Sequence, residues 1–181
     1  METPLFNKAW QESKVRIFRL EALPEYDVSE DREAFEKWKN GDNKFTEYEG
    51  WFNLLKAAAE KGMSVQRVRV VRSPSEYLKY EIDLWKVSRN FGEQAMFLEE
   101  EKYQKIFQEF GLESKDFWLF DDKLLIVFHY DQKGSLVEEE LITDKGIVSK
   151  YLELKKKLIE NSLSMTPFLY KAKRLRQLGN L

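Results

Sequence analysis

The first third of the chain is dominated by apolar residues at helical spacing. Residues 3–14, 29–39 and 44–61 each place apolar side chains three or four positions apart, which is typical of amphipathic helices. A glycine follows the second and the third of these segments, as is common at helix ends. We therefore predict three N-terminal helices, with a short strand over residues 15–22 between the first two.

Residues 64–85 join a strand pattern to a helix pattern, and we expect the rest of the chain to be organised around them. Arg67 and Arg69 alternate with valines, which predicts a strand that carries both arginines on one face. On an exposed face they would form an ordinary polar surface. On a buried face each would need an acidic partner, because an unpaired buried charge costs roughly several kcal/mol. The candidate partners are Glu81, Asp121 and Asp122.

The helix after this strand has a clear start signal. Ser73 occupies an N-cap position, Pro74 the first helical position, and Glu76 the last position of a capping box. We therefore predict a helix that begins at Pro74. The turn between strand and helix leaves free backbone N–H groups beside Arg72, so this corner can hold an anion, although water is the usual occupant of such corners.

The strongest strand pattern lies in the second half of the chain. Residues 116–120 and 123–130 flank Asp121 and Asp122, which form a predicted hairpin turn. A second turn leads to residues 136–142 as a third antiparallel strand. The middle strand of the three is apolar on both faces, so we expect it inside the sheet. The other predicted elements are a strand over residues 94–99 and helices over residues 100–110, 147–159 and 168–178.

Together these patterns predict an α/β (or α+β) fold. We expect a mixed sheet of about five strands that contains an antiparallel hairpin or meander and is packed by N-terminal and C-terminal helices. Residues 1–150 are predicted to form a single α/β domain, on which the N-terminal helices of residues 1–62 pack. Residues 151–181 are predicted to form a C-terminal helical extension. A chain of 181 residues with 43% hydrophobic content can build one substantial core.

Composition excludes several classes of chemistry. The sequence contains no cysteine, which excludes disulfides, thiolate catalysis and cysteine-ligated metals. The net charge of -2, from 30 basic and 32 acidic residues, does not indicate a general nucleic-acid-binding surface. No apolar run approaches the roughly 18 residues that span a bilayer, and the N-terminus has no signal-peptide pattern. We therefore expect a soluble, cytoplasmic protein.

The sequence offers few routes to catalysis. His129 is the one histidine, so a metal site with two histidines cannot form within this chain. No G-x-S-x-G nucleophile elbow and no phosphate-binding glycine loop occurs. The adjacent Asp121 and Asp122 suit turn chemistry better than a metal site, because aspartates in turns bond nearby backbone N–H groups. We predict no catalytic residue, no metal and no cofactor.

Three phrases resemble a known family. They are FRLEALPEYDVSEDREAFEKWKNG at residues 18–41, RVRVVRSPSEYLKYE at residues 67–81 and DFWLFDD at residues 116–122. Together they are similar to the uncharacterised bacterial family described as domain of unknown function 6879, over about residues 6–149. The resemblance implies a small stand-alone protein that is encoded near helix-turn-helix regulators and has no established activity. The basic helices after Lys150 exceed the pattern expected of the family.

The predicted order of elements also resembles a second group at the level of fold. A strand, a capped helix, a short strand and a hairpin are similar to the phospholipase-D-like ligand-binding domains of bacterial transcription regulators. Active members of that fold use H-x-K-x-x-x-x-D, normally twice. Here Asp131 stands where the lysine would follow His129, and no second histidine exists. This resemblance therefore implies ligand binding without catalysis of that type.

The residues predicted to bind a ligand gather, in our interpretation, around the corner between strand and helix. They are Arg67, Arg69, Arg72, Ser73, Tyr77, Tyr80, Trp118 and Asp121. The arginines would supply paired donors to an anion, and the aromatic rings would supply a stacking surface.

The leading hypothesis is a non-catalytic regulatory or binding module, accessory to a helix-turn-helix regulator, that recognises a partner protein or a small anionic ligand. Two other classes remain open. A phosphodiesterase or nuclease would need His129 in a concave site with at least two carboxylates. A nucleic-acid-binding protein would need Lys171, Lys173, Arg174 and Arg176 to join the arginines of the corner in one positive surface.

Overall fold

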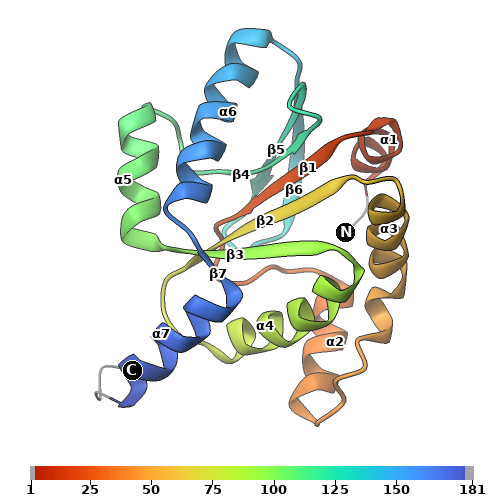
Figure 1. Cartoon of the computed structure of the whole chain (residues 1–181), viewed down its shortest axis with the longest axis vertical. Helices are drawn as coiled ribbons and strands as arrows, with labels where there is room; N and C mark the ends of the chain where they lie inside the picture. Colours follow the sequence, from red (N-terminus) through yellow and green to blue (C-terminus); the bar gives the residue numbers. More distant parts are fainter. Residues whose placement is uncertain (1–2, 178–181) are drawn as a thin grey trace.

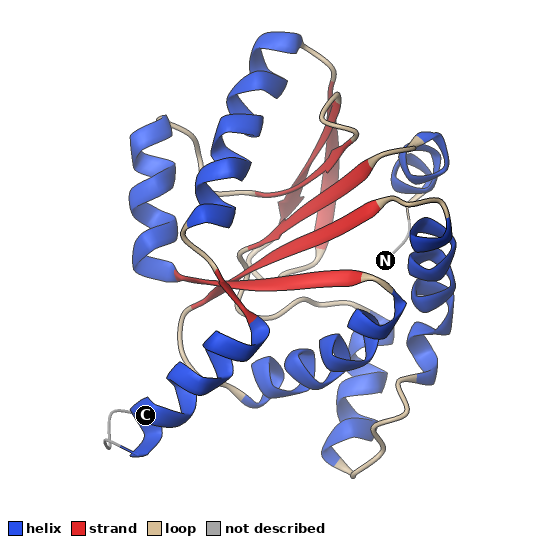
Figure 2. Ribbon diagram, viewed as in Figure 1, coloured by secondary structure: helices blue, strands red, loops and turns tan. Residues whose placement is uncertain are grey.

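The computed structural model describes residues 3–177 and has one mixed sheet with helices on both faces (Figures 1 and 2). The strands are β1 (Arg16–Glu21), β2 (Ser64–Val71), β3 (Glu93–Glu99), β4 (Asp116–Phe120), β5 (Leu124–Tyr130), β6 (Leu136–Ile142) and β7 (Leu163–Ser164). The α-helices are α1 (Pro4–Glu12), α2 (Ser29–Lys39), α3 (Glu49–Glu60), α4 (Glu76–Ser88), α5 (Glu100–Phe110), α6 (Lys145–Glu160) and α7 (Met165–Gln177). Short 3-10 turns, η1 (Thr46–Tyr48) and η2 (Arg89–Phe91), precede α3 and follow α4.

The seven strands lie in the order β6-β5-β4-β1-β2-β3-β7. The three strands β1, β2 and β3 are parallel, and the others pair antiparallel to their neighbours. The prediction of an α/β fold with a mixed sheet and an antiparallel meander is confirmed, but about five strands is too few. The meander and the parallel unit supply six strands. The seventh, β7, has two residues and is too short to leave an alternating pattern in the sequence.

The two faces of the sheet have different cores. Alternation along β1 sends Phe18 and Leu20 to the face covered by α5 and α6, where the core is apolar. The same alternation sends Ile17, Arg19 and Glu21 to the opposite face, covered by α1, α2, α3 and α4. Figure 1 shows these two sets of helices on opposite sides of the strands. Polar chemistry is therefore concentrated on the α1–α4 face.

The start of α4 differs from the prediction. The helix begins at Glu76, and the side chain of Ser75 accepts a hydrogen bond from the backbone N–H of Leu78 at 3.0 Å. The predicted capping box at Ser73 and the helical position of Pro74 are therefore wrong by two residues. Two serines flank the proline, and the second of them caps the helix.

The C-terminal third packs as part of the same structure. Residue 150, the predicted end of the domain, lies within α6, whose apolar side belongs to the core of the α5–α6 face. The helix α7 packs by Met165 and Phe168 against Phe97 of β3 and the outer side of α4. No helix within residues 3–177 is both long and apolar enough to span a bilayer.

The hairpin turn at Asp121 ties the N-terminus of β1 to the sheet. The carboxylate of Asp121 accepts hydrogen bonds from the backbone N–H groups of Lys14, Val15 and Arg16 at 2.8, 2.8 and 2.9 Å. Burial raises the pKa of Asp121, but these bonds outweigh burial and hold the pKa below its ordinary value. The predicted hairpin turn is confirmed, but the prediction that the Asp121 side chain bonds nearby backbone groups is wrong, because its backbone partners lie more than a hundred residues away in sequence.

Substitution of Asp121 by alanine should destabilise the fold more than the same change at Asp122. Both residues have positive φ, 50° and 57°, so placing alanine in this backbone conformation costs a similar free energy in both variants. Asp122 makes ion pairs with Arg16 and Lys155 and no backbone clamp. We expect Asp121→Ala to lower the free energy of unfolding by about 1–2 kcal/mol more than Asp122→Ala does. Urea unfolding of both variants measures this difference, and equal losses would contradict it.

Candidate functional site

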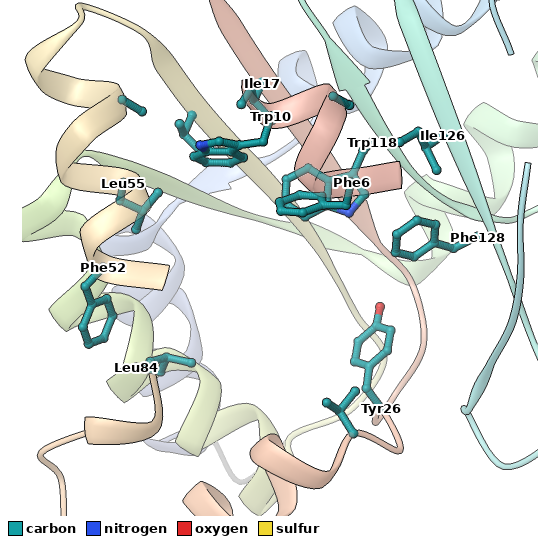
Figure 3. Close-up of a cluster of buried hydrophobic side chains, with 14 of the residues drawn as sticks. Phe6, Trp10, Ile17, Tyr26, Phe52, Leu55, Leu84, Trp118, Ile126 and Phe128 are labelled. Atoms are coloured by element: carbon teal, nitrogen blue, oxygen red, sulfur yellow. The ribbon is translucent and has the colours of Figure 1, made fainter. Parts of the chain in front are cut away.

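A cavity of about 130 Å³ lies on the α1–α4 face of the sheet. Its walls combine charged side chains, many aromatic rings and a few aliphatic groups. The charged residues are Arg19, Glu21, Asp31, Arg67 and Glu81, and the aromatic ones are Phe6, Tyr26, Tyr48, Trp51, Tyr77, Tyr80, Trp85, Trp118, Phe128 and Tyr130. Figure 3 shows part of this wall, with Phe6, Trp118 and Phe128 on the side of the strands, Leu84 opposite them, and the Tyr26 hydroxyl pointing inward.

The register of the central strands brings the charges together. Arg19 of β1 lies beside Arg67 of β2, and Glu21 lies beside Arg69 in the next pair. On the other side of β1, Trp118 of β4 lies beside Arg19. Since partners in a sheet present side chains to the same face, one patch carries three guanidinium groups, a carboxylate and an indole ring.

Two guanidinium groups share one oxygen of Glu21. Oε1 of this carboxylate lies 2.8 Å from NH2 of Arg19 and 2.5 Å from NH1 of Arg67. Arg67 also donates from Nε to Oε1 of Glu93 at 2.8 Å. Burial raises the pKa of Glu21, but Arg19, Arg67 and Arg69 outweigh burial and lower the pKa to about 2. Glu21 is therefore ionised at neutral pH.

Arg69, at the edge of this charged cluster, links β2 to α4 and to the loop after β1. Its Nε donates to Oε2 of Glu81 at 2.9 Å, and NH2 donates to the carbonyl oxygen of Pro24 at 2.8 Å. A further bond from NH1 reaches the carbonyl oxygen of Leu23. Burial raises the pKa of Glu81 and the charge of Arg69 lowers it. Arg69 divides its donors among three acceptors, so the effect of burial is larger and the pKa of Glu81 is about 8. The loop that follows β1 is thereby anchored to the sheet.

Two of the guanidinium groups also make cation–π contacts with tryptophan rings. Arg67 lies over the rings of Trp51 and Trp85, with its Cζ atom 5.9 and 5.7 Å from the ring centroids. Arg19 lies over Trp118 at 4.8 Å. These cation–π contacts hold both cations in place in addition to their ion pairs.

Carboxyl and hydroxyl groups form two hydrogen-bonded clusters at the cavity. Tyr48 donates to Oδ1 of Asp31, and its hydroxyl oxygen lies 2.6 Å from that of Tyr80. Tyr26 donates to Oδ2 of Asp116 at 2.5 Å. Burial raises the pKa of Asp31, and it raises the pKa of Asp116 to about 6. The hydroxyl groups that point toward the cavity are thus already oriented by carboxyl groups.

The structure brings together some of the predicted ligand-binding residues and separates others. Arg67, Tyr77, Tyr80 and Trp118 line the cavity, and Arg69 lies next to it through Glu81.

Three predicted residues lie elsewhere. Arg72 and Ser73 border a separate cleft of about 850 Å³ between α4 and α7, where Arg72 pairs with Glu100 at 2.8 Å. The molecule's own helix α7 therefore lies along the corner that the sequence indicated. Asp121 holds the backbone before β1.

The prediction of acidic partners for the arginines is confirmed for Glu81 and is wrong for Asp121 and Asp122. The residues that sequence reasoning missed are Glu21 and Glu93. A signal for Glu21 existed, because Arg19 and Glu21 are two apart in the first predicted strand and must share a face.

The residues of the rival functions do not converge on this cavity. His129 lies on β5 with Nε2 3.3 Å from Oε2 of Glu140. Among the side chains that the structure describes, no three of histidine, aspartate or glutamate are arranged to hold a metal ion. Lys171 pairs with Glu99, and Lys173 is exposed. The side chains of Arg174 and Arg176 lie outside the described part of the structure.

A continuous positive surface that includes the arginines of β2 is not formed. The side chains of Arg67 and Arg69 are only 10% and 2% exposed, so they cannot contact a nucleic acid that lies on the surface.

The sequence profile of the family described as a domain of unknown function (DUF6879) matches residues 4–170. This match confirms the resemblance seen in the three sequence phrases. It continues past residue 149 through α6 and into α7, so the expectation that the helices after Lys150 exceed the family pattern is wrong for this span. None of the curated proteins matches the chain.

Asp116 should make the fold less stable as the pH rises. Burial raises its pKa from the ordinary value near 3.8 to about 6, so the folded state holds the proton more tightly than the unfolded state does. Its stabilising contribution is complete below the ordinary pKa and is lost as the pH rises through 6. Relative to Asp116→Asn, which does not titrate, the wild type should lose on the order of 3 kcal/mol between about pH 4 and pH 7.5.

Urea unfolding across this pH range measures the difference. Asp131→Asn is the control, because the contribution of Asp131 to stability changes with pH in the opposite direction. Backbone N–H groups of Ser135 and Lys133 lower the pKa of Asp131, so its contribution is lost on acidification instead. A wild-type curve parallel to that of Asp116→Asn would contradict the prediction.

Proposed function

We propose that this chain, which belongs to the family described as a domain of unknown function (DUF6879), is a non-catalytic module that binds a small molecule in the cavity on the α1–α4 face. The single observation that carries the proposal is the cavity itself, enclosed by an ion-paired cluster where the opposite face of the sheet has an apolar core. A cavity that combines apolar walls with a few polar groups suits a small ligand.

The size of the cavity limits the ligand. An apolar cavity of about 150 Å³ in another protein is known to hold benzene. The cavity here, about 130 Å³, is of the same order. We therefore expect a ligand, or the buried part of one, of roughly five to ten heavy atoms.

Some residues of the cavity wall are half-buried. Arg19, Asp31, Tyr48, Trp51 and Tyr130 keep part of their surface exposed, whereas lining residues such as Tyr80 and Trp118 are buried. We expect a ligand to enter beside these half-buried residues.

The composition of the lining supports binding rather than catalysis. Its residues include no serine, threonine, cysteine, lysine or histidine. Nucleophilic catalysis often uses one of these side chains with a base near it, and the carboxyl groups that are present pair with arginines or tyrosines instead. The tyrosine hydroxyl groups of Tyr26 and Tyr48 donate to carboxyl groups, which keeps them protonated. The side chains available to a ligand are thus suited to holding it.

Nuclear magnetic resonance of the tryptophan side chains tests the proposal. The chain has five tryptophans, of which Trp51, Trp85 and Trp118 line the cavity while Trp10 and Trp38 do not. A library of small polar metabolites should contain compounds that shift the three cavity indole N–H signals in a saturable way. The other two signals should stay in place.

A pair of variants locates the binding event. Val28→Phe places a ring in the cavity and should abolish these shifts, because it fills the space the ligand needs. Val137→Phe makes the same change at an exposed position of β6 and should leave binding unchanged. A ligand that binds Val28→Phe as well as it binds the wild type would rule the cavity out.

A further inference from the structure

We infer that the ligand of this cavity carries a cationic hydrogen-bond donor such as a primary ammonium group. The donor forms its hydrogen bond with Oε2 of Glu21. This inference rests on the proposed function and adds the chemical class of the ligand. It departs from the small anionic ligand that the arginines of the sequence suggested.

Glu21 has one oxygen to spare. Its Oε1 meets both Arg19 and Arg67, but its Oε2 is buried and has no hydrogen-bond partner among residues 3–177. The side chain is 5% exposed and belongs to the cavity wall. A buried, ionised acceptor without a partner is costly, and a donor in the cavity would remove that cost.

Acidic side chains exceed basic ones around the cavity. Glu21, Asp31 and Glu81 line it, against Arg19 and Arg67. Directly behind the wall, Glu93 and Asp116 outnumber Arg69. Burial raises the pKa of Glu81 to about 8, so this carboxyl group is largely protonated at neutral pH, and burial also raises the pKa of Asp31. A cation bound in the cavity would favour the ionised form of Glu81, which would then supply a second carboxylate to it, whereas an anion would keep Glu81 neutral.

Arg67 is poorly placed to receive an anion. Arg67 is held by Glu21 and Glu93 and lies over two tryptophan rings. An anionic ligand would have to compete with these buried carboxylates for the same N–H donors. The ring faces of the lining are electron-rich and favour cations as well.

Three compounds that share a four-carbon chain test the charge preference. Butylamine is a cation at neutral pH, butanol is neutral and butyrate is an anion. We expect butylammonium to shift the indole signals of Trp51, Trp85 and Trp118 with an affinity at least about tenfold higher than that of butanol or butyrate. This comparison uses the wild-type protein and needs no variant to fold.

A matched pair of substitutions assigns the preference to Glu21. Glu21→Gln keeps the size of the side chain and should weaken butylammonium binding by about tenfold or more, because an amide offers no anionic acceptor. Glu93→Gln removes a negative charge from the same cluster, but not from the cavity wall, and should weaken binding by less than about threefold.

The outcomes separate the two proposals. If butanol or butyrate shifts the three cavity signals as strongly as butylammonium does, the cavity binds small molecules and the inference about charge is wrong. If none of the three compounds shifts them, while a metabolite without a cationic group does, the inference is again overturned and the proposed function stands. If neither the compounds nor the library shift them, the cavity holds only water and both proposals fail. Shifts confined to Trp10 or Trp38 would place the binding outside the cavity and would also overturn the inference.

Discussion

The buried carboxylate of Glu21 is the central interaction of this structure, because two buried guanidinium groups form ion pairs with it. Arg19 is its neighbour on the same strand and Arg67 reaches it from the next. A shift of one residue in the pairing of β1 with β2 would move these charges into the apolar core under α5 and α6. The ion pairs therefore specify the register of the parallel strands as well as the chemistry of the α1–α4 face.

The contrast between the two faces supports the proposal that the cavity binds a ligand. On the α5–α6 face, aliphatic and aromatic side chains fill the core, as stability alone requires. Replacing a buried ion pair by well-packed apolar residues is often neutral or stabilising. A charged cluster in a position that could have been apolar agrees with the proposed role in binding, and the unpaired Oε2 atom of Glu21 favours a cationic ligand.

Local patterns predicted most of the elements, and long-range pairing decided the site. The alternation of Arg67 and Arg69 indicated one shared face, and one of their partners, Glu81, was among the candidates. Glu93 has no local signal, because its pairing with Arg67 depends on the order of the strands, whereas the local signal for Glu21 is its spacing of two from Arg19. The prediction places Asp121 near the arginines because it expects the hairpin turn to lie there. In the structure, Asp121 lies at one end of β4, and it is Asp116 at the other end of β4 that lies near the arginines. The cap of α4 was misplaced for a local reason, since either serine beside Pro74 satisfies the sequence signal.

The position of β1 has a consequence for how the chain assembles. This strand precedes β2 and β4 in the sequence, yet it lies between them, and the clamp on its first residues comes from Asp121, 105 positions after Arg16. The chain as far as β4 must therefore be synthesised before β1 has both neighbours. Closing such a long loop slows the search for the native topology. A growing chain can form local helices early, but it completes the α1–α4 face only after β4 has been synthesised.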